Sequence, residues 1–325
     1  KTEAEDARDV ATDAQEEALR HLWQAYLSQA RASRWSGRSG QRLDSLDALA
    51  KAAELAPRLG LGDDQKMELR NEAIACLTLV DLRVVKQWDC PTNPDRFAVD
   101  FFRDFESYAE FDGEAHIVTR RVADRNEITR LTCAGTPLSL RLSPDGRWLA
   151  ANSTQGDACQ LAVWDLTSRK AVLSVPNRGE AWNVAFSPDG RRLATEAADG
   201  SIQVYDLDRG KEWTRITPTS KPAQIRFPPD GQRLGVSSTV GQTVEVWDLN
   251  TGRILQTLRH PKQVMGIGWR PDGKLLAAAC WDFRVYVWDA DSGSLQRVLE
   301  GHKSVVHRVD FHPTQNLLVS HAWDG

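Results

Sequence analysis

The feature that most constrains the fold is an internal repeat of about 42 residues in the second part of the chain. Four turns carry the sequence Pro-Asp-Gly, and their prolines, with a fifth in the same register, stand at positions 144, 188, 229, 271 and 313. An apolar residue lies two positions before each of these prolines. Pairs of an aromatic residue and aspartate keep the same period at Trp164-Asp165, Tyr205-Asp206, Trp247-Asp248 and Trp288-Asp289. Three markers in one register indicate a repeated structural unit.

The chemistry of one unit predicts a small antiparallel sheet. Proline fixes φ at the first corner of a tight turn, and glycine supplies a left-handed position, so each Pro-Asp-Gly closes a hairpin. The segment that ends at Trp288 alternates apolar and polar residues, as a half-buried strand does, and a second turn follows at 291–293. About four strands fit into each unit. Such a sheet cannot bury both faces alone, so neighbouring units are expected to stack on it.

These residues resemble the WD40 family, whose repeats each contribute four strands to a β-propeller. The resemblance implies that a Gly-His pair, a Ser, a turn Asp and the Trp of Trp-Asp hold each blade together through hydrogen bonds. The last copy matches at Gly301-His302, Ser320 and Asp324, and turn Asp residues of earlier copies match at Asp199 and Asp282. The expected fold class is therefore mainly β, a WD40 β-propeller preceded by an α-helical segment.

Several repeats depart from the pattern of this family. His260 follows Arg259 where Gly-His is expected, Tyr205 replaces the tryptophan, and Gly241 stands at the position of the turn Asp. We expect these blades to depend on packing more than on the polar network of the family.

The propeller is expected to occupy residues 83–325. At about 42 residues a blade, residues 85–325 give about 5.7 blades, so the chain should stop inside a blade. The expected parent ring has six or, by preference, seven blades. The segment Leu82 to Trp88 would be the outer strand that completes the last blade.

Residues 1–82 have a helical period instead. Residues 1–35 form one long amphipathic helix, with alanines spaced three and four apart in a stripe that Leu22 and Tyr26 continue. Residues 36–82 form a two-helix connector whose helices run to about Leu55 and to about Val80. Because alanine buries little area at a helix seam, a coiled coil formed by the first helix would give at most a weak homodimer.

The helical part also resembles the connector of large bacterial receptor-like serine/threonine kinases. The segments that carry this resemblance are Leu27 to Gly37, Gly40 to Leu49 and Glu68 to Arg83. It implies that a kinase domain and a membrane helix precede Lys1 in a bacterial signalling protein; the sequence itself assigns no compartment. The 325 residues contain no kinase motif, phosphate-binding loop or nucleophile elbow, so we expect this segment not to be an enzyme.

Composition excludes several classes of partner. The formal net charge is −4, from 41 basic and 45 acidic residues, so nucleic acid is not an expected partner. No apolar run is long enough to span a bilayer, and no membrane insertion is expected within the segment. Four histidines fall at 302, 307, 312 and 321, but His307 and His312 would lie on opposite faces of a strand, so no metal and no cofactor are expected.

Twelve tryptophans are many for a chain with four tyrosines. The repeat explains Trp164, Trp247 and Trp288, and it gives structural roles to Asp165, Asp206, Asp248 and Asp289. Trp281 and Trp323 each precede a turn Asp, and Trp182 lies near the start of a first strand. These three are either buried between blades or form an exposed patch that binds a partner.

The expected function is a non-catalytic scaffold or sensor module that binds a protein or peptide on one face of the propeller, linked to a kinase. Two alternatives stay open: a soluble scaffold without a kinase, and an enzymatic propeller with its substrate in the central channel. An enzymatic channel would need convergent carboxylates, a metal or a cofactor, and the aspartates of this repeat have structural explanations.

Overall fold

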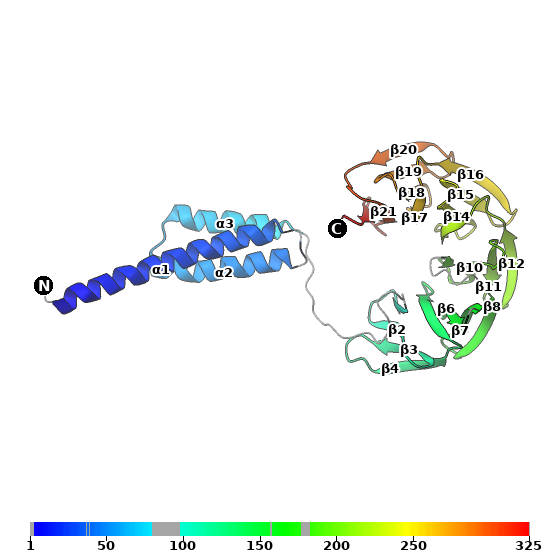
Figure 1. Ribbon diagram of the computed structural model, residues 1–325, viewed down its shortest axis with the longest axis horizontal. Helices are drawn as coiled ribbons and strands as arrows, with labels where there is room; N and C mark the ends of the chain where they lie inside the picture. The colour runs from blue at the N-terminus through cyan, green and yellow to red at the C-terminus, as the bar shows by residue number, and fades with distance from the viewer. Residues whose placement is uncertain are drawn as a thin grey trace. The chain divides into compact units, whose positions relative to one another are not determined.

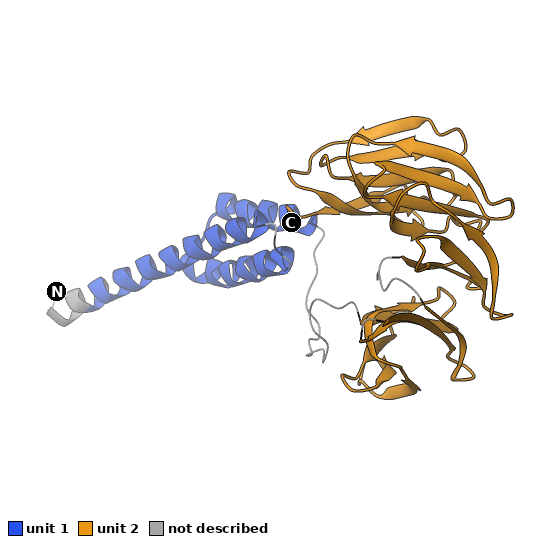
Figure 2. Ribbon diagram, turned by 45° about the vertical axis from the view of Figure 1, so that its right-hand side comes forward, with its two compact units in different colours: residues 1–89 blue, residues 90–325 orange. Residues whose placement is uncertain are grey.

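The structure is a computed structural model, and it describes residues 3–36, 38, 40–79, 98–156, 158–176 and 183–324. The chain divides into two compact units, residues 1–89 and 90–325 (Figure 2). The boundary expected between residues 82 and 83, and the closing strand expected from Leu82 to Trp88, lie outside the described residues. Both stay predictions.

The described residues of the first unit form three helices: α1 (Glu3–Arg34), α2 (Gln41–Leu59) and α3 (Asp63–Leu77). Their shared core includes Trp23 and Leu27 of α1, Leu49 and Ala52 of α2, and Cys76 of α3. The second helix is longer than expected because Pro57 lies inside its last turn, where only one backbone hydrogen bond is lost. The third helix ends earlier than expected, at Leu77. In the described part of the chain, no helix has the length and apolar character needed to cross a membrane.

The buried face of α1 differs from the predicted stripe. Leu22 is 41% exposed, whereas its neighbour Trp23 is 7% exposed and packs into the core. Tyr26 packs against the same core from a half-buried position. Towards the N-terminus Ala11, Ala14 and Ala18 are exposed, because only the C-terminal half of α1 meets α2 and α3.

The described part of the second unit contains six antiparallel sheets, numbered in chain order. Sheet 1 contains β1 (Val99–Phe101), β2 (Ser107–Phe111), β3 (His116–Arg121) and β4 (Glu127–Thr132), and sheet 2 contains β5 (Thr136–Leu142), β6 (Trp148–Gln155), β7 (Ala158–Asp165) and β8 (Lys170–Pro176). Sheet 3 contains β9 (Val184–Phe186), β10 (Arg192–Glu196), β11 (Ile202–Asp206) and β12 (Lys211–Ile216), and sheet 4 contains β13 (Pro222–Arg226), β14 (Arg233–Ser238), β15 (Thr243–Asp248) and β16 (Arg253–Arg259). Sheet 5 contains β17 (Val264–Trp269), β18 (Leu275–Cys280), β19 (Val285–Asp289) and β20 (Leu295–Leu299), and sheet 6 contains β21 (Val306–Phe311) and β22 (Leu318–Ala322).

The sheets follow one another around a common centre (Figure 1). The first strand of each sheet contacts the first strand of the next, from β1 and β5 through to β17 and β21, while the fourth strands β4, β8, β12, β16 and β20 lie on the outside. Buried clusters join neighbouring sheets; one of them brings Ile225 and Leu234 of sheet 4 together with Val204 of sheet 3. The predicted mainly β fold class, a propeller of four-stranded antiparallel blades, is confirmed.

The turns divide the propeller into two faces. At the first Pro-Asp-Gly turn, Gly146 has φ +72° and donates its N–H to the carbonyl of Ser143 over 2.9 Å. Because the strands alternate in direction, these turns and the turns between third and fourth strands lie on one face, which we call the turn face. The turns between second and third strands, and the connections between sheets, lie on the opposite face, which we call the connection face.

Candidate functional site

The two described candidate tryptophans both lie on the connection face. Trp281 follows β18 and Trp323 follows β22, and their side chains are 38% and 67% exposed. Only their backbones join the sheet: the N–H of Trp281 donates to the carbonyl of Gln263 over 2.9 Å, and that of Trp323 to Val305 over 3.2 Å. The third candidate, Trp182, lies outside the described residues.

Two further apolar side chains extend this surface. Phe283, in the same turn as Trp281, is 43% exposed and has φ +72°, and Val240, between β14 and β15, is 70% exposed. Val240, Trp281, Phe283 and Trp323 thus expose apolar area at the turns of three successive sheets, and we call them the aromatic face. Sequence reasoning missed Phe283 and Val240. The period could have found Val240, which stands 41 residues before Trp281.

The connections beside the aromatic face carry a lysine at a regular interval. Lys221, Lys262 and Lys303 stand 41 residues apart, each just before the first strand of a sheet. Lys262 and Lys303 are exposed. The turn aspartates on this face, Asp282 and Asp324, are drawn into contacts within the protein, with side chains only 12% and 22% exposed. Two exposed lysines, Lys262 and Lys303, therefore lie in the connections on the same face as the exposed apolar groups.

A pair of histidines lies beside Trp323. His307 Nε2 lies 3.0 Å from His321 Nδ1, and the His307 ring centroid lies 5.9 Å from that of Trp323. Burial lowers the pKa of His307, and the neighbouring His321 and Arg308 lower it further. Two nitrogens alone do not complete a zinc site. Among the described residues, no group of three or more His, Cys, Asp or Glu side chains is placed to hold a metal ion.

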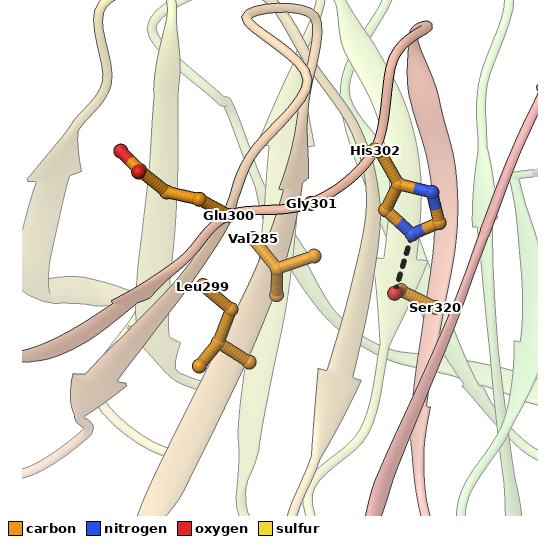
Figure 3. A pocket seen from close by; sticks show the side chains of 6 residues that line it. All are labelled: Val285, Leu299, Glu300, Gly301, His302 and Ser320. Atoms are coloured by element: carbon orange, nitrogen blue, oxygen red, sulfur yellow. Dashed lines mark hydrogen bonds between the residues drawn. The ribbon is translucent and has the colours of Figure 1, made fainter.

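In sheet 6 the predicted polar residues meet directly. His302 Nε2 lies 2.8 Å from Ser320 Oγ, and His302 Nδ1 lies 3.2 Å from Asp324 Oδ1. Asp324 also accepts the backbone N–H of Lys303 over 2.6 Å, and this hydrogen bond lowers the pKa of its carboxyl group. His302 and Ser320 line a pocket of about 300 Å³ together with Val285, Leu299, Glu300 and Gly301 (Figure 3). The three polar side chains tie the connection before β21 to the end of β22.

In sheet 5 a different set of side chains makes the polar contacts. Trp288 is half-buried, and its Nε1–H donates to His260 Nε2 over 3.0 Å. Asp282 accepts the hydroxyl of Tyr286 over 2.5 Å, and burial, with this hydrogen bond, raises the pKa of Tyr286 to about 12. Burial lowers the pKa of His260 to about 4. His260 is therefore neutral at pH 7, and its Nε2 can accept the hydrogen bond from the indole N–H of Trp288.

Sheet 4 replaces the absent histidine and turn Asp with a glutamate. Trp247 is 6% exposed, and its Nε1–H donates to Glu245 Oε2 over 2.9 Å. Glu245 is 3% exposed and also accepts the backbone N–H of Thr219 over 3.2 Å and the hydroxyl of the same residue. This sheet lacks the polar network of the family, but its buried indole N–H still needs an acceptor, and Glu245 supplies one.

In sheet 3 the predicted turn Asp contacts its own turn and the fourth strand. Asp199 accepts the hydroxyl of Ser201 over 2.6 Å and lies 3.3 Å from an Arg215 nitrogen, and its side chain is 61% exposed. The contact across this sheet comes instead from Asn183, which donates to the buried Glu196. Tyr205 replaces tryptophan and is 4% exposed.

The aspartates of the aromatic-Asp pairs hold the turns between third and fourth strands. Asp165 accepts the backbone N–H groups of Thr167 and Ser168 over 2.8 and 2.9 Å, and these hydrogen bonds lower its pKa. The three later copies, Asp206, Asp248 and Asp289, accept backbone N–H groups at the matching positions. Trp164 is 6% exposed.

Comparison with known proteins agrees with this geometry. The family described as WD domain, G-beta repeat matches residues 170–206, 252–289 and 293–325. A periodic tryptophan protein 2 homolog of Dictyostelium discoideum is 29% identical over 208 residues, which cover 61% of this chain and 22% of that protein. Protein groucho of Drosophila melanogaster is 30% identical over 195 residues, covering 58% and 26% of the two chains. WD repeat-containing protein SL1-17 of Schistosoma mansoni is 30% identical over 160 residues, covering 49% and 52%.

The chain spans about a fifth of the length of the first of these relatives. Three stretches of the chain match the WD40 model, and one of these relatives is named as a WD repeat-containing protein. The predicted WD40 repeats are therefore confirmed in these stretches.

Proposed function

We propose that the propeller is a non-catalytic binding module that docks a protein segment on its connection face. WD40 repeat proteins generally act as scaffolds that mediate protein–protein interactions. The observation that carries the proposal is the aromatic face: four apolar side chains stay exposed at the turns of three successive sheets, while the tryptophans of the repeat core are buried or half-buried. Large aromatic side chains with few rotamers are favourable anchors in interfaces.

The charges around this surface favour an acidic occupant. Lys262 and Lys303 lie in the connections whose backbone carbonyls accept the N–H groups of Trp281 and Trp323, and both lysines are exposed. Asp282 and Asp324 have their carboxylates engaged within the protein. An acidic segment with one or two apolar side chains would place its carboxylates near the lysines and its apolar groups on the indoles, so the two kinds of contact would support each other.

The proposal is tested by replacing the indoles. Peptides that bind the wild-type chain are selected from a library of acidic and basic sequences that contain aromatic residues, and their affinity is measured by fluorescence anisotropy. Because interface anchors are worth about 2 kcal/mol or more, we expect the double variant Trp281→Ala, Trp323→Ala to bind at least about 30-fold more weakly. The same change at the candidate Trp182 is measured alongside. The melting temperature should change by only a few degrees, because the two described side chains are exposed.

A matched control is Phe105→Ala, since this side chain is 72% exposed but lies on the turn face. It should leave peptide affinity unchanged. A melting temperature that falls by many degrees in the tryptophan variants would show that the indoles are core residues. Selection of basic peptides would contradict the acidic occupant.

We infer from the kinase-like connector that this module belongs to a bacterial signalling protein with a serine/threonine kinase domain. Support comes from the residues of 27–83 alone; the relatives named above are eukaryotic, and their names mention no kinase. The full reading frame is the test. Kinase motifs and a membrane helix encoded before Lys1 would support the proposal, and their absence would leave a scaffold without a kinase.

A further inference from the structure

The inner strands of the propeller carry an unusual set of charges. Asp100 lies on β1, Arg141 on β5, Arg226 on β13, and Arg308 and Asp310 on β21. Arg141, Arg226 and Asp310 share one register position, three residues before the proline of the repeat. The strands between them, β9 and β17, have Ala185 and Gly268 at this position. Large charged and small side chains therefore alternate around the centre of the ring.

The small residues bring these charges together. A Cβ on Gly266 would lie 2.5 Å from the carbonyl oxygen of His307, and one on Gly268 would lie 2.6 Å from that of Val309. Only glycine lets β21 approach β17 this closely. With no side chain at Gly268, Arg226 reaches past β17, and its Nη2 lies 3.7 Å from Asp310 Oδ1.

Three guanidinium groups from three sheets lie within electrostatic range of one another. Burial lowers the pKa of Arg226, and Arg308 and Arg141 lower it further, while Asp310 opposes them. Burial also lowers the pKa of Arg141, with Arg308 acting in the same direction. Two carboxylates face three guanidiniums, so one positive charge is left over. Like charges gathered in one place repel one another, and an anion bound among them would offset this repulsion.

The guanidinium groups have many unused donors. Arg141 Nη1 donates to the carbonyl of Leu140 over 3.0 Å, and Arg308 Nε donates to Asp310 over 3.2 Å. Five N–H groups on each side chain make about fifteen donors in all, and these contacts use few of them. The side chains of Arg226 and Arg308 are 36% and 60% exposed, so solutes can reach them.

We propose that the centre of the propeller is a binding site for a small phosphate-bearing anion, held by Arg141, Arg226 and Arg308. The planar guanidinium group pairs with phosphate oxygens through two parallel hydrogen bonds. An anion at this point offsets the surplus positive charge. This site is separate from the aromatic face, so Trp281→Ala and Trp323→Ala leave it intact.

Isothermal titration of the 325-residue protein with inorganic pyrophosphate and with inorganic phosphate tests the proposal. We expect saturable binding with one site, and at least tenfold weaker binding in Arg141→Gln and in Arg226→Gln. The control Arg297→Gln, on the outer strand β20 and exposed, binds as the wild type does. No saturable binding, or equal weakening in the control, overturns the proposal.

A variant that is expected to bind the anion more tightly distinguishes an effect on the site from a loss of folding. Asp310 competes with the anion for Arg226 and Arg308, so Asp310→Asn should tighten pyrophosphate binding several-fold. Unchanged or weaker binding in a folded Asp310→Asn variant overturns the proposal. Sodium chloride at equal ionic strength should give no saturable signal; an equal signal would show general screening instead of a site.

Discussion

At the scale of single residues, one structural task is solved by different chemistry from sheet to sheet. A third-strand indole N–H needs an acceptor once the sheets stack, because an unpaired buried donor is unfavourable. His260 supplies this acceptor to Trp288, and Glu245 supplies it to Trp247. His302 instead joins Ser320 to Asp324. The irregular repeats therefore keep polar contacts at these positions, but different side chains make them.

His260 should make stability depend on pH. Its pKa is about 4 in the folded protein against 6.5 for a free histidine, so below pH 6.5 the unfolded chain binds the proton first. The free energy of unfolding should therefore fall by about 2 kcal/mol from pH 7 to pH 5 through this group alone. Urea unfolding at both values measures the change.

The control for this effect is His260→Gln, which keeps an acceptor for the indole of Trp288 but does not titrate. All other groups contribute equally to the two proteins, so the difference between their pH slopes isolates His260. Parallel slopes for the variant and the wild type would contradict the assigned neutral state.

At the scale of elements, the inner strand β17 depends on its glycines. The N–H of Ile267, between the two glycines, donates to Gln224 Oε1 of sheet 4 over 2.7 Å. On the other side the backbone of β21 lies against Gly266 and Gly268. The strand is therefore fixed to both neighbouring sheets, with no free space on the β21 side.

Gly266→Ala should destabilise the propeller. The new Cβ meets the carbonyl oxygen of His307 at 2.5 Å, and a backbone atom cannot move aside as a side-chain end can. Overpacking of this kind costs about 1 to 3 kcal/mol, which chemical denaturation would detect. Gly235→Ala is the comparison, because its nearest neighbour is the end of the Ile267 side chain at 3.0 Å. An equal loss in both variants would show that strand propensity, and not the contact with β21, causes the effect.

The same elements show what a sequence can predict. Turn residues and apolar alternation act locally, so the strands and their hairpins could be predicted from the period. The end of α2 could not, because Pro57 usually marks a helix boundary and is tolerated here only within the last turn. Leu22 and Trp23 are adjacent, and tertiary packing alone decides which of them α1 buries.

At the scale of the whole molecule, the contacts between sheets are what the sequence could not predict. Trp281 and Trp323 occupy the same position, directly after the second strand of their sheets. The repeat in the sequence identified that position as a candidate site. The arginine cluster depends on which side chains face one another across the channel. Arg141 and Arg226 are 85 residues apart, and the glycines that let β21 approach lie in yet another repeat. No local pattern contains that information.

The first helix of the helical unit is expected to associate weakly with a second copy of itself. Ala11, Ala14 and Ala18 form an exposed stripe on α1 beyond the core of this unit. Alanine methyl groups bury little area, so two such stripes should associate only weakly. Sedimentation equilibrium of residues 1–89 should show monomer at low micromolar concentration and dimer only at high micromolar concentration.

Replacement of Ala11 and Ala18 by leucine should strengthen the dimer, because it enlarges the apolar seam, whereas Ala14→Glu should abolish it. A unit that stays monomeric at high micromolar concentration, with and without the leucines, would rule out association through α1.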